Sequence, residues 1–323
     1  MSDSEQLLAP SLRRAAAMVL RQRKTALVEA TRAAVREHVP LSIRIERKRL
    51  ERYPSWLAEH AEMATARTTP KDRAAYIHLL ASKTSPLQRG TGYGGAKQQA
   101  KEANVRRVAG LINGVRIGPG QVFSYHHVVG RPSLLRGFAP GPELREGKLS
   151  IGVGGGACQV TNMLFQLGLL SGLEVVERHR HGLDLFPDVG RNVPFGCGAT
   201  VFYNMADLRL RNPHPRAIVW RLQVRDGQLI GALVSPSPPT DAYEVFETLH
   251  RFTQQGTCWQ RENRIVRRTL PRDGVPCVDE EVVHNIATTA YTPQCLDAPK
   301  HDLRSEPVTW LPASDALRAT DAV

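Results

Sequence analysis

IGVGGGACQVTNMLFQLGLLSG, residues 151–172, decides the fold, because it joins a run of glycines to an apolar segment. Four glycines lie between residues 152 and 156 and lead into Cys158. Apolar residues then recur at steps of three and four, which predicts a helix of about three turns. Gly172 follows the last apolar pair and is typical of a helix C-terminus. The sequence therefore places Cys158 in or next to the first turn of a helix.

A cysteine at the start of a helix is a candidate nucleophile. Unpaired N–H groups and the positive end of the helix dipole favour an anion there, and we expect them to lower the pKa of the thiol. The N–H groups of Gly155 and Gly156, together with Gln159, are expected to line a site for an oxyanion. The structural alternative is a tight connection in which the cysteine fills a small buried space.

Two histidines that follow the helix are candidates for the base that a cysteine nucleophile needs. Residues 173–183, LEVVERHRHGL, alternate enough to predict a strand on which His179 and His181 share a face. The pair also fits a solvated strand face or two metal ligands. Cys158, His179 and His181 are therefore the predicted catalytic residues.

A second pair of histidines lies upstream of the glycine run. Residues 121–129 predict a strand that carries His126 and His127 near its end. Adjacent residues on a strand point to opposite faces, so at most one of the two enters a shared site. Tyr125 and Tyr203 are expected to line the same pocket.

Composition narrows the classes of partner. The 323 residues carry a formal net charge of +12, which favours acidic partners. Nucleic acid is disfavoured, because we find no zinc finger, RNA-binding signature or interleaving of aromatic and basic residues. The 5 cysteines form no Cys-x-x-Cys pair, which argues against a zinc ribbon or a redox dithiol. Without a recognisable secretory signal or a run of about 18 apolar residues, the expected location is cytoplasmic.

The distribution of apolar, proline and glycine residues predicts an α+β fold, in which a helical N-terminal region packs on a mostly antiparallel sheet core. A small strand-rich extension is expected to follow the core. Asp226-Gly227 predicts a hairpin within the core, and three strands are expected in the extension, over residues 243–252, 259–270 and 280–288. The predicted parts are a helical region (1–84), the core (85–235), the extension (236–300) and a poorly ordered tail (301–323).

The core resembles the VanW family, which is named from vancomycin-resistance gene clusters. The glycine run with Cys-Gln, followed by Glu-Arg-His-x-His, is specific to that family in this order. The resemblance spans about residues 85–235 and is carried by PGQVFSYHHVVG (119–130), GFAPGPELREGKL (137–149), GVGGGACQVTNMLF (152–165), GLEVVERHRHG (172–182), GATVFYN (198–204) and DLRLRNP (207–213).

The resemblance implies chemistry on the cell wall. VanW-like domains in some exported cell-wall proteins are associated with L,D-transpeptidation of peptidoglycan, with the motif cysteine as nucleophile. Carried over to this chain, that implies Cys158 as the acyl-enzyme nucleophile and His179 or His181 as the base. The implied substrate is a peptide or a small peptidoglycan-related molecule, and no cofactor is needed. Peptidoglycan is cross-linked outside the membrane, which contrasts with the expected cytoplasmic location.

The third catalytic residue and two other functions stay open. Many relatives have an acidic residue where this chain has Gly198, so Asp184, Asp188 or Glu177 is expected to orient the base if a third residue exists. One alternative function is a zinc-dependent hydrolase, with ligands drawn from Cys158, His179, His181 and one of His126 and His127. The other is a non-catalytic module that binds peptidoglycan precursors or assists glycopeptide resistance. The sequence does not specify an oligomeric state.

Overall fold

The computed structural model describes residues 39–59, 62–88, 94–145, 148–180, 182–184, 187, 193–271, 275–293, 295–296 and 300–307. The chain divides into two compact units, residues 1–54 and 55–323. In the first unit, the described residues form most of helix α2 (Leu41–Glu59), where Arg47 pairs with Glu51 one turn later at 2.8 Å. The part of the predicted helical region before residue 39 lies outside the described residues.

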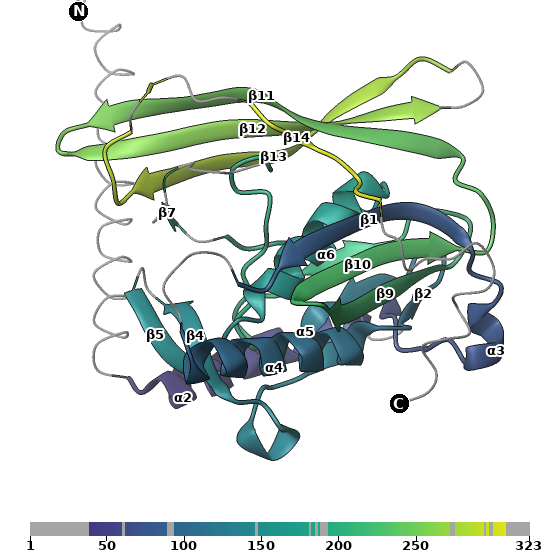
Figure 1. Ribbon diagram of the computed structural model, residues 1–323, viewed down its shortest axis with the longest axis horizontal. Helices are drawn as coiled ribbons and strands as arrows, with labels where there is room; N and C mark the ends of the chain where they lie inside the picture. Colours follow the sequence, from purple (N-terminus) through teal and green to yellow (C-terminus); the bar gives the residue numbers. More distant parts are fainter. Residues whose placement is uncertain are drawn as a thin grey trace, which may run out of the picture. The chain divides into compact units, whose positions relative to one another are not determined.

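The centre of the second unit is an antiparallel sheet of four strands (Figure 1). Asp226 and Gly227 both have positive φ values, of 50° and 69°, as the predicted tight hairpin requires. This turn joins two strands whose side chains are largely buried, with Trp220 at their centre. In order, the strands are β1 (His78–Pro86), β10 (Gln228–Ser235), β9 (Ile218–Arg225) and β2 (Arg116–Ile117).

A second sheet is formed by the C-terminal part of the chain. Its three long strands coincide with the three predicted for the extension and are confirmed, although they are longer than expected. Two short strands complete its edges, one of them parallel to its neighbour. The order is β14 (Asp302–Leu303), β11 (Asp241–Gln255), β12 (Cys258–Pro271), β13 (Val278–Thr289) and β7 (Leu183–Asp184).

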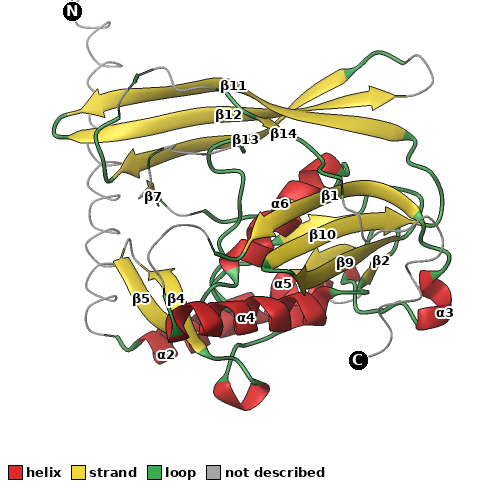
Figure 2. Cartoon of the chain, in the orientation of Figure 1, coloured by secondary structure: helices red, strands yellow, loops and turns green. Residues whose placement is uncertain are grey.

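Helix α6 (Cys158–Leu170) is the predicted helix after the glycine run, and it packs against β1 and β10 as well as β11. Its side chains at Leu164 and Leu167 are fully buried. Helix α4 (Ala96–Ile112) contacts β9 and the hairpin strand β4 (Pro140–Arg145). With helices and antiparallel sheets in one core, the α+β class is confirmed (Figure 2).

The remaining elements are short and surround the start of α6. A hairpin, β4 with β5 (Lys148–Val153), leads directly into the glycine run. A small sheet has the order β3 (Val122–Ser124), β8 (Arg209–Arg211) and β6 (Glu174–Glu177). The other helical segments are α3 (Pro70–Arg73), α5 (Tyr125–Val129) and the 3₁₀ helix η2 (Leu134–Arg136).

Two predicted strands are wrong over much of their length. The one over residues 121–129 ends at Ser124, whose hydroxyl accepts the N–H of His127 and caps helix α5, so His126 and His127 lie on a helical turn. The one over residues 173–183 ends at Glu177, and the chain then leaves the sheet before His179.

Two boundaries also differ from those predicted. Strand β1 begins at His78, so the central sheet takes residues from the region expected to be helical. Residues 301–307, expected in a poorly ordered tail, include β14 and a segment bonded to β1, where the Glu306 N–H donates to the Ser82 carbonyl at 2.8 Å.

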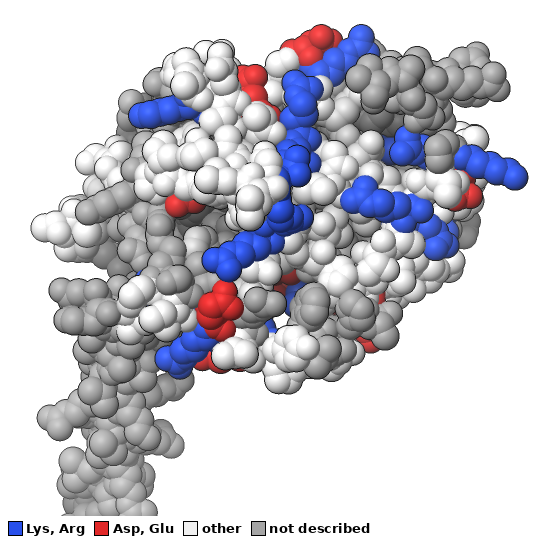
Figure 3. Space-filling view, turned by 90° about the horizontal axis from the view of Figure 1, so that it is seen from below, with Lys and Arg blue, Asp and Glu red and all other residues white. Residues whose placement is uncertain are grey.

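The excess of positive charge is visible on one face of the molecule. In Figure 3, Lys and Arg side chains gather in a band, and fewer Asp and Glu side chains lie beside them. The band is consistent with the formal net charge of +12. Among the described residues, no helix has the length and apolar character needed to cross a membrane.

Candidate functional site

Cys158 is the first residue of α6, as the sequence predicts, and it is half-buried. Burial raises the pKa of its thiol, and the nearby Glu143 carboxylate acts in the same direction, while a backbone hydrogen bond from Val201 opposes them. The expected lowering of the thiol pKa at the helix start is therefore wrong, because burial is the largest influence on this pKa and raises it. The resting thiol is neutral.

The glycine run serves close packing against β4. A Cβ on Gly155 would overlap the carbonyl oxygen of Gly141, and the Gly155 N–H donates to the Gly152 carbonyl at 3.0 Å. Buried Asn104 donates to the Gly155 carbonyl at 2.9 Å. The amide of Gly155 is thus engaged, whereas the N–H of Gly156 has no hydrogen-bond partner within the described part of the chain.

Gln159 joins the first turn of α6 to the end of β1. Its amide nitrogen donates to the Ser85 hydroxyl at 2.8 Å and to the Pro86 carbonyl at 2.9 Å. Its amide oxygen is buried and has no hydrogen-bond partner among the described residues. The Gln159 amide nitrogen, which was expected to face an oxyanion, is therefore engaged in these two contacts.

His179 follows β6 and is oriented by a carboxylate. Its Nε2 lies 2.8 Å from Glu177 Oε1, and its side chain is 44% exposed. Glu177 is itself fixed, because the Asp207 N–H donates to the same oxygen at 3.1 Å and Arg209 Nε lies 3.4 Å from the other. This is the carboxylate–imidazole arrangement that orients a catalytic base. His181 lies outside the described residues.

His126 is held by its ring and its backbone. Its Nε2 donates to the Ala206 carbonyl at 2.7 Å, and the Phe202 carbonyl lies 3.2 Å away. Carbonyl oxygens only accept, so Nε2 carries a proton and the buried Nδ1, which has no hydrogen-bond partner among the described residues, presents a lone pair when the ring is neutral. The Tyr203 ring packs against it edge-on at 5.4 Å.

One segment, residues 199–202, connects the predicted site residues. The Thr161 hydroxyl donates from α6 to the Ala199 carbonyl at 2.6 Å. The Thr200 N–H donates to the His179 carbonyl at 2.9 Å. The Val201 N–H donates to the Cys158 sulfur. The Phe202 carbonyl lies near the His126 ring. Cys158, His126 and His179 therefore surround a single stretch of backbone.

Tyr125 completes the interior side of this site. It is 2% exposed, and burial is the main cause that raises the pKa of its phenol. The phenol is therefore neutral and keeps its proton as a hydrogen-bond donor. His127 is located by its backbone N–H, which donates to the Ser124 hydroxyl at 3.1 Å.

Two acidic residues in the site were missed by the sequence analysis. Asp207 is 2% exposed and accepts hydrogen bonds from the Ser124 hydroxyl at 2.6 Å and the His126 N–H at 3.0 Å. Glu143 lies over Gly152, where a Cβ would overlap its carboxylate. Asp207 opens the motif DLRLRNP, and that position was the available signal. Glu143 lies in the motif GFAPGPELREGKL, but only the hairpin register brings it to the glycine run.

The structure distinguishes the candidates for a third residue. Glu177 contacts His179, whereas Asp184 accepts hydrogen bonds from Arg261 and Tyr291, both at 2.7 Å. Asp188 lies outside the described residues. An acidic side chain at position 198 would not fit without a rearrangement, because a Cβ on Gly198 would overlap the amide oxygen of Asn162.

The structure gives limited information on metal ligands. Among the described residues, no group of three or more His, Cys, Asp or Glu side chains is placed to hold a metal ion. The set expected for zinc included His181, which is not described, so this set stays untested as a whole.

Comparisons with known proteins agree with these motifs. Residues 100–234 match the family model described as "VanW like protein". Over 184 residues the chain is 27% identical to the vancomycin B-type resistance protein VanW of Enterococcus faecalis (strain ATCC 700802 / V583), a match that covers 54% of this chain and 67% of that protein.

A second relative is the uncharacterized protein YoaR of Bacillus subtilis (strain 168). The two chains are 31% identical over 155 residues, which cover 47% of this chain and 48% of YoaR. No solved structure matches the chain. The family match includes the glycine run and Cys158, and by this match residues 100–234 of the chain are a VanW-like domain.

Proposed function

We propose that the chain is a cysteine acyl-transferase or peptidase that acts on a cell-wall-type peptide through a thioester on Cys158. The observation that carries the proposal is the placement of this thiol at the start of α6, beside a segment that also holds His179 and His126. The name of the Enterococcus faecalis relative, a vancomycin resistance protein, supports a substrate drawn from the cell wall.

The resting thiol is neutral, so a base has to act when the substrate is bound. His179 takes the thiol proton, and the sulfur attacks the carbonyl carbon of the substrate amide. The C–N bond breaks, the leaving amine takes the proton from His179, and a thioester remains on Cys158. An acceptor amine, or water, then attacks the thioester and gives its proton to His179, which returns it to the sulfur.

The groups around the reacting atoms have separate tasks. Glu177 orients the His179 ring and stabilises its charged form. The N–H groups of Gly156 and Val201 are the donors we assign to the developing oxyanion. His126, whose Nε2 is bonded to a backbone carbonyl, holds the 202–206 turn in place as a positioning residue.

The proposal is tested with purified full-length chain and peptidoglycan stem peptides carrying labelled D-amino-acid acceptors. We expect exchange or hydrolysis by the wild type and loss of turnover in Cys158→Ala and Cys158→Ser. Cys258→Ala is the matched control, because Cys258 is exposed at the first position of β12. Undiminished turnover by Cys158→Ala would refute the role of the thiol.

A second candidate function is non-catalytic binding of a peptidoglycan precursor. It is favoured by the raised pKa of the Cys158 thiol and by the engaged donors of Gly155 and Gln159. It predicts that the wild type binds stem peptides without turning them over and that Cys158→Ala binds them with the same affinity. The exchange assay and a binding isotherm together separate the two functions.

A further inference from the structure

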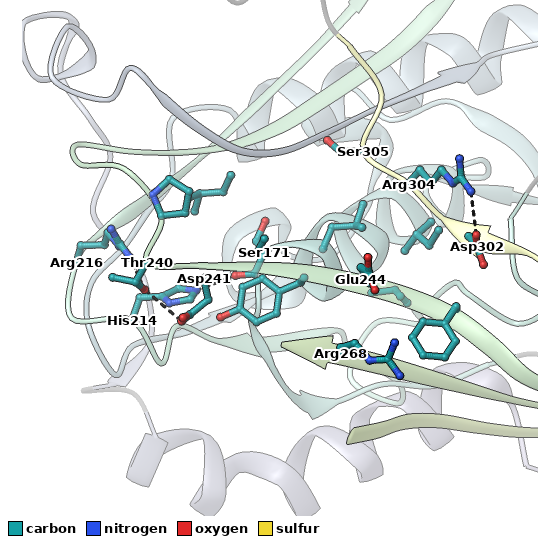
Figure 4. Close-up of a pocket in the computed structure, with 18 residues that line it drawn as sticks. Ser171, His214, Arg216, Thr240, Asp241, Glu244, Arg268, Asp302, Arg304 and Ser305 are labelled. Atoms are coloured by element: carbon teal, nitrogen blue, oxygen red, sulfur yellow. Dashed lines mark hydrogen bonds and ion pairs between the residues drawn. The ribbon is translucent and has the colours of Figure 1, made fainter. Parts of the chain in front are cut away.

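A pocket of about 570 Å³ lies at the C-terminal end of α6, at the end of the helix opposite Cys158 (Figure 4). Its walls come from the start of β11, the 214–216 segment, and the strand β14 with the residues after it. The volume is within the range of small-molecule sites, about 300–1,000 Å³. The pocket is therefore large enough for a small ligand and is separate from the proposed catalytic residues.

One end of the pocket presents Arg216, a cation that makes no ion pair among the described residues, although the Asp241 carboxylate lies beyond Thr240, whose hydroxyl donates to it at 3.2 Å. Arg216 donates to the Thr240 hydroxyl at 3.1 Å, to the Ser237 hydroxyl at 3.3 Å and to the Pro238 carbonyl, all of them neutral groups. Its Nε is buried and has no acceptor among the described residues. A guanidinium held by neutral partners keeps its full positive charge for a carboxylate.

The other arginines that line the pocket are already paired. Arg268 makes two hydrogen bonds to Asp279, at 2.7 and 2.8 Å, and Arg304 lies 3.0 Å from Asp302. Arg216 differs from both, because no ion pair to it exists within the described part of the chain. It is therefore the lining cation best placed to bind an anionic group.

The middle of the pocket presents groups that suit a cation. Glu244 is exposed and has no hydrogen bond or ion pair among the described residues, although it lies opposite Arg268 in the strand register. Ser171, at the C-cap of α6, is 3% exposed, and its hydroxyl has no hydrogen-bond partner in the described residues. The C-terminal end of a helix dipole also favours positive charge.

His214 keeps this region from becoming more positive. Its Nε2 donates to the Ser171 carbonyl at 2.7 Å, and burial lowers the pKa of its imidazole, so the ring is neutral at pH 7. Leu170, Tyr243 and Leu303 supply apolar surface beside it. The pocket thus combines an arginine and a glutamate that make no ion pair within the described part of the chain, a second carboxylate at Asp241 and an apolar wall.

We propose that this pocket binds a short peptide with free termini, its carboxylate on Arg216 and its ammonium group at Glu244. Ser171 lies between these two residues in Figure 4 and is placed to hydrogen-bond the peptide. This binding site is independent of the acyl-transfer chemistry proposed for Cys158.

The test is titration of the full chain with alanyl-alanine, in L,L and D,D forms, by isothermal calorimetry or ligand-observed NMR. We expect the free dipeptide to bind and both the N-acetyl and the C-terminal amide derivatives to bind about 10-fold more weakly or worse. Equal binding of all three forms, or no binding of the free dipeptide, would overturn the proposal. These comparisons need no variant protein.

Variants assign each end of the peptide. Arg216→Gln should remove the difference between free acid and amide, and Glu244→Gln the difference between free amine and N-acetyl derivative. Arg225→Gln and Glu281→Gln, which replace exposed charges outside the pocket, are the matched controls. Cys158→Ala should leave binding unchanged, so failure of the catalytic proposal is distinguishable from failure of this one. Preferences that persist in Arg216→Gln and Glu244→Gln would contradict the assignment.

Discussion

Cys158 combines a helix-start position with a burial that keeps its sulfur protonated. The free energy of removing a thiolate from water exceeds what the unpaired N–H groups of α6 return, so the raised pKa is the net result. A catalytic role then depends on proton transfer to His179 at the moment of attack. A thiol that is kept protonated is also less open to alkylation and oxidation.

The first prediction concerns the pH dependence of that thiol. Iodoacetamide should modify Cys158 more slowly than exposed Cys258 at pH 7, because less of a raised-pKa thiol is present as thiolate. The rate at Cys158 should still be rising above pH 9. Peptide-level mass spectrometry of pH-resolved alkylation measures both sites in one sample. Faster modification of Cys158 than of Cys258 at pH 7 would contradict the raised pKa.

The second prediction concerns the partner of His179. Glu177→Gln removes the charge that orients and stabilises the imidazolium, so turnover should fall by about 10–100-fold and the acid limb of the rate profile should move. Glu174→Gln, on the same strand and 58% exposed beside Arg211, is the matched control. If Glu177→Gln and Glu174→Gln change kcat and its pH profile equally, Glu177 has no specific role in the mechanism.

At the scale of single residues, the sequence predicts the position of Cys158 better than it predicts the pKa of its thiol. The glycine run and the apolar repeat are local, and they predict Cys158 at a helix start correctly. Its pKa depends on Glu143 and Val201, which reach it only through the hairpin register and the 199–202 segment. The spacing of residues does not tell how far distant segments bury the Cys158 thiol, so it does not predict the pKa.

At the scale of elements, the glycines before α6 allow two backbones to touch. Gly155→Ala should destabilise the chain by about 1–3 kcal/mol, because the added Cβ overlaps the Gly141 carbonyl, which is backbone and cannot move aside easily. Gly110→Ala, on an exposed position of α4 with no atom within 4 Å of the added carbon, should stabilise by about 0.5–1 kcal/mol. Urea denaturation of both variants measures the contrast, and effects of the same sign would contradict it.

Element prediction succeeded where the periodicity was long and failed where a cap intervened. The three strands of the C-terminal sheet and helix α6 follow uninterrupted patterns and are confirmed. The strand predicted over residues 121–129 was wrong because the Ser124 hydroxyl caps a helical turn. The sequence contains both the alternating pattern of a strand and a serine that can cap a helix. Because α5 is short, the cap formed by Ser124 is enough to favour the helical turn.

At the scale of the second unit, a buried polar seam joins strands β7, β11 and β12 of the C-terminal sheet to one another. Arg261 is fully buried and donates to Asp184 at 2.7 Å and to His250 at 2.9 Å. The guanidinium carbon lies 3.9 Å from the centre of the Phe195 ring. Buried charges of this kind are costly when one partner is removed, since the other is left without compensation.

A buried and an exposed arginine on β12 provide a matched pair of variants that tests the contribution of the seam to stability. Arg261→Met should lower the free energy of unfolding by about 3–5 kcal/mol, because Asp184 is left buried without its partner. Arg264→Met, whose side chain is 47% exposed and pairs with Glu281 at 3.4 Å, should change it by less than about 1 kcal/mol. Similar effects of the two substitutions in urea denaturation would show that the seam contributes no more than a surface ion pair.

The sequence could not have predicted this seam. Asp184 and Arg261 are 77 residues apart, and each occurs in a segment where a surface charge is the ordinary expectation. Their pairing follows from β7 joining the edge of β13, a parallel contact between separate parts of the chain. Composition and periodicity therefore predict the long strands, while the addition of β7 to the edge of their sheet needs the three-dimensional structure.

The most direct measurement is intact-mass and peptide-level mass spectrometry of chain mixed with a peptidoglycan stem peptide and quenched in acid. The predicted result is an added mass equal to the acyl part of the peptide, located on Cys158, released by hydroxylamine and lacking in Cys158→Ala. An acyl group on another residue, or turnover by Cys158→Ala at the wild-type rate, would contradict thioester chemistry at this cysteine.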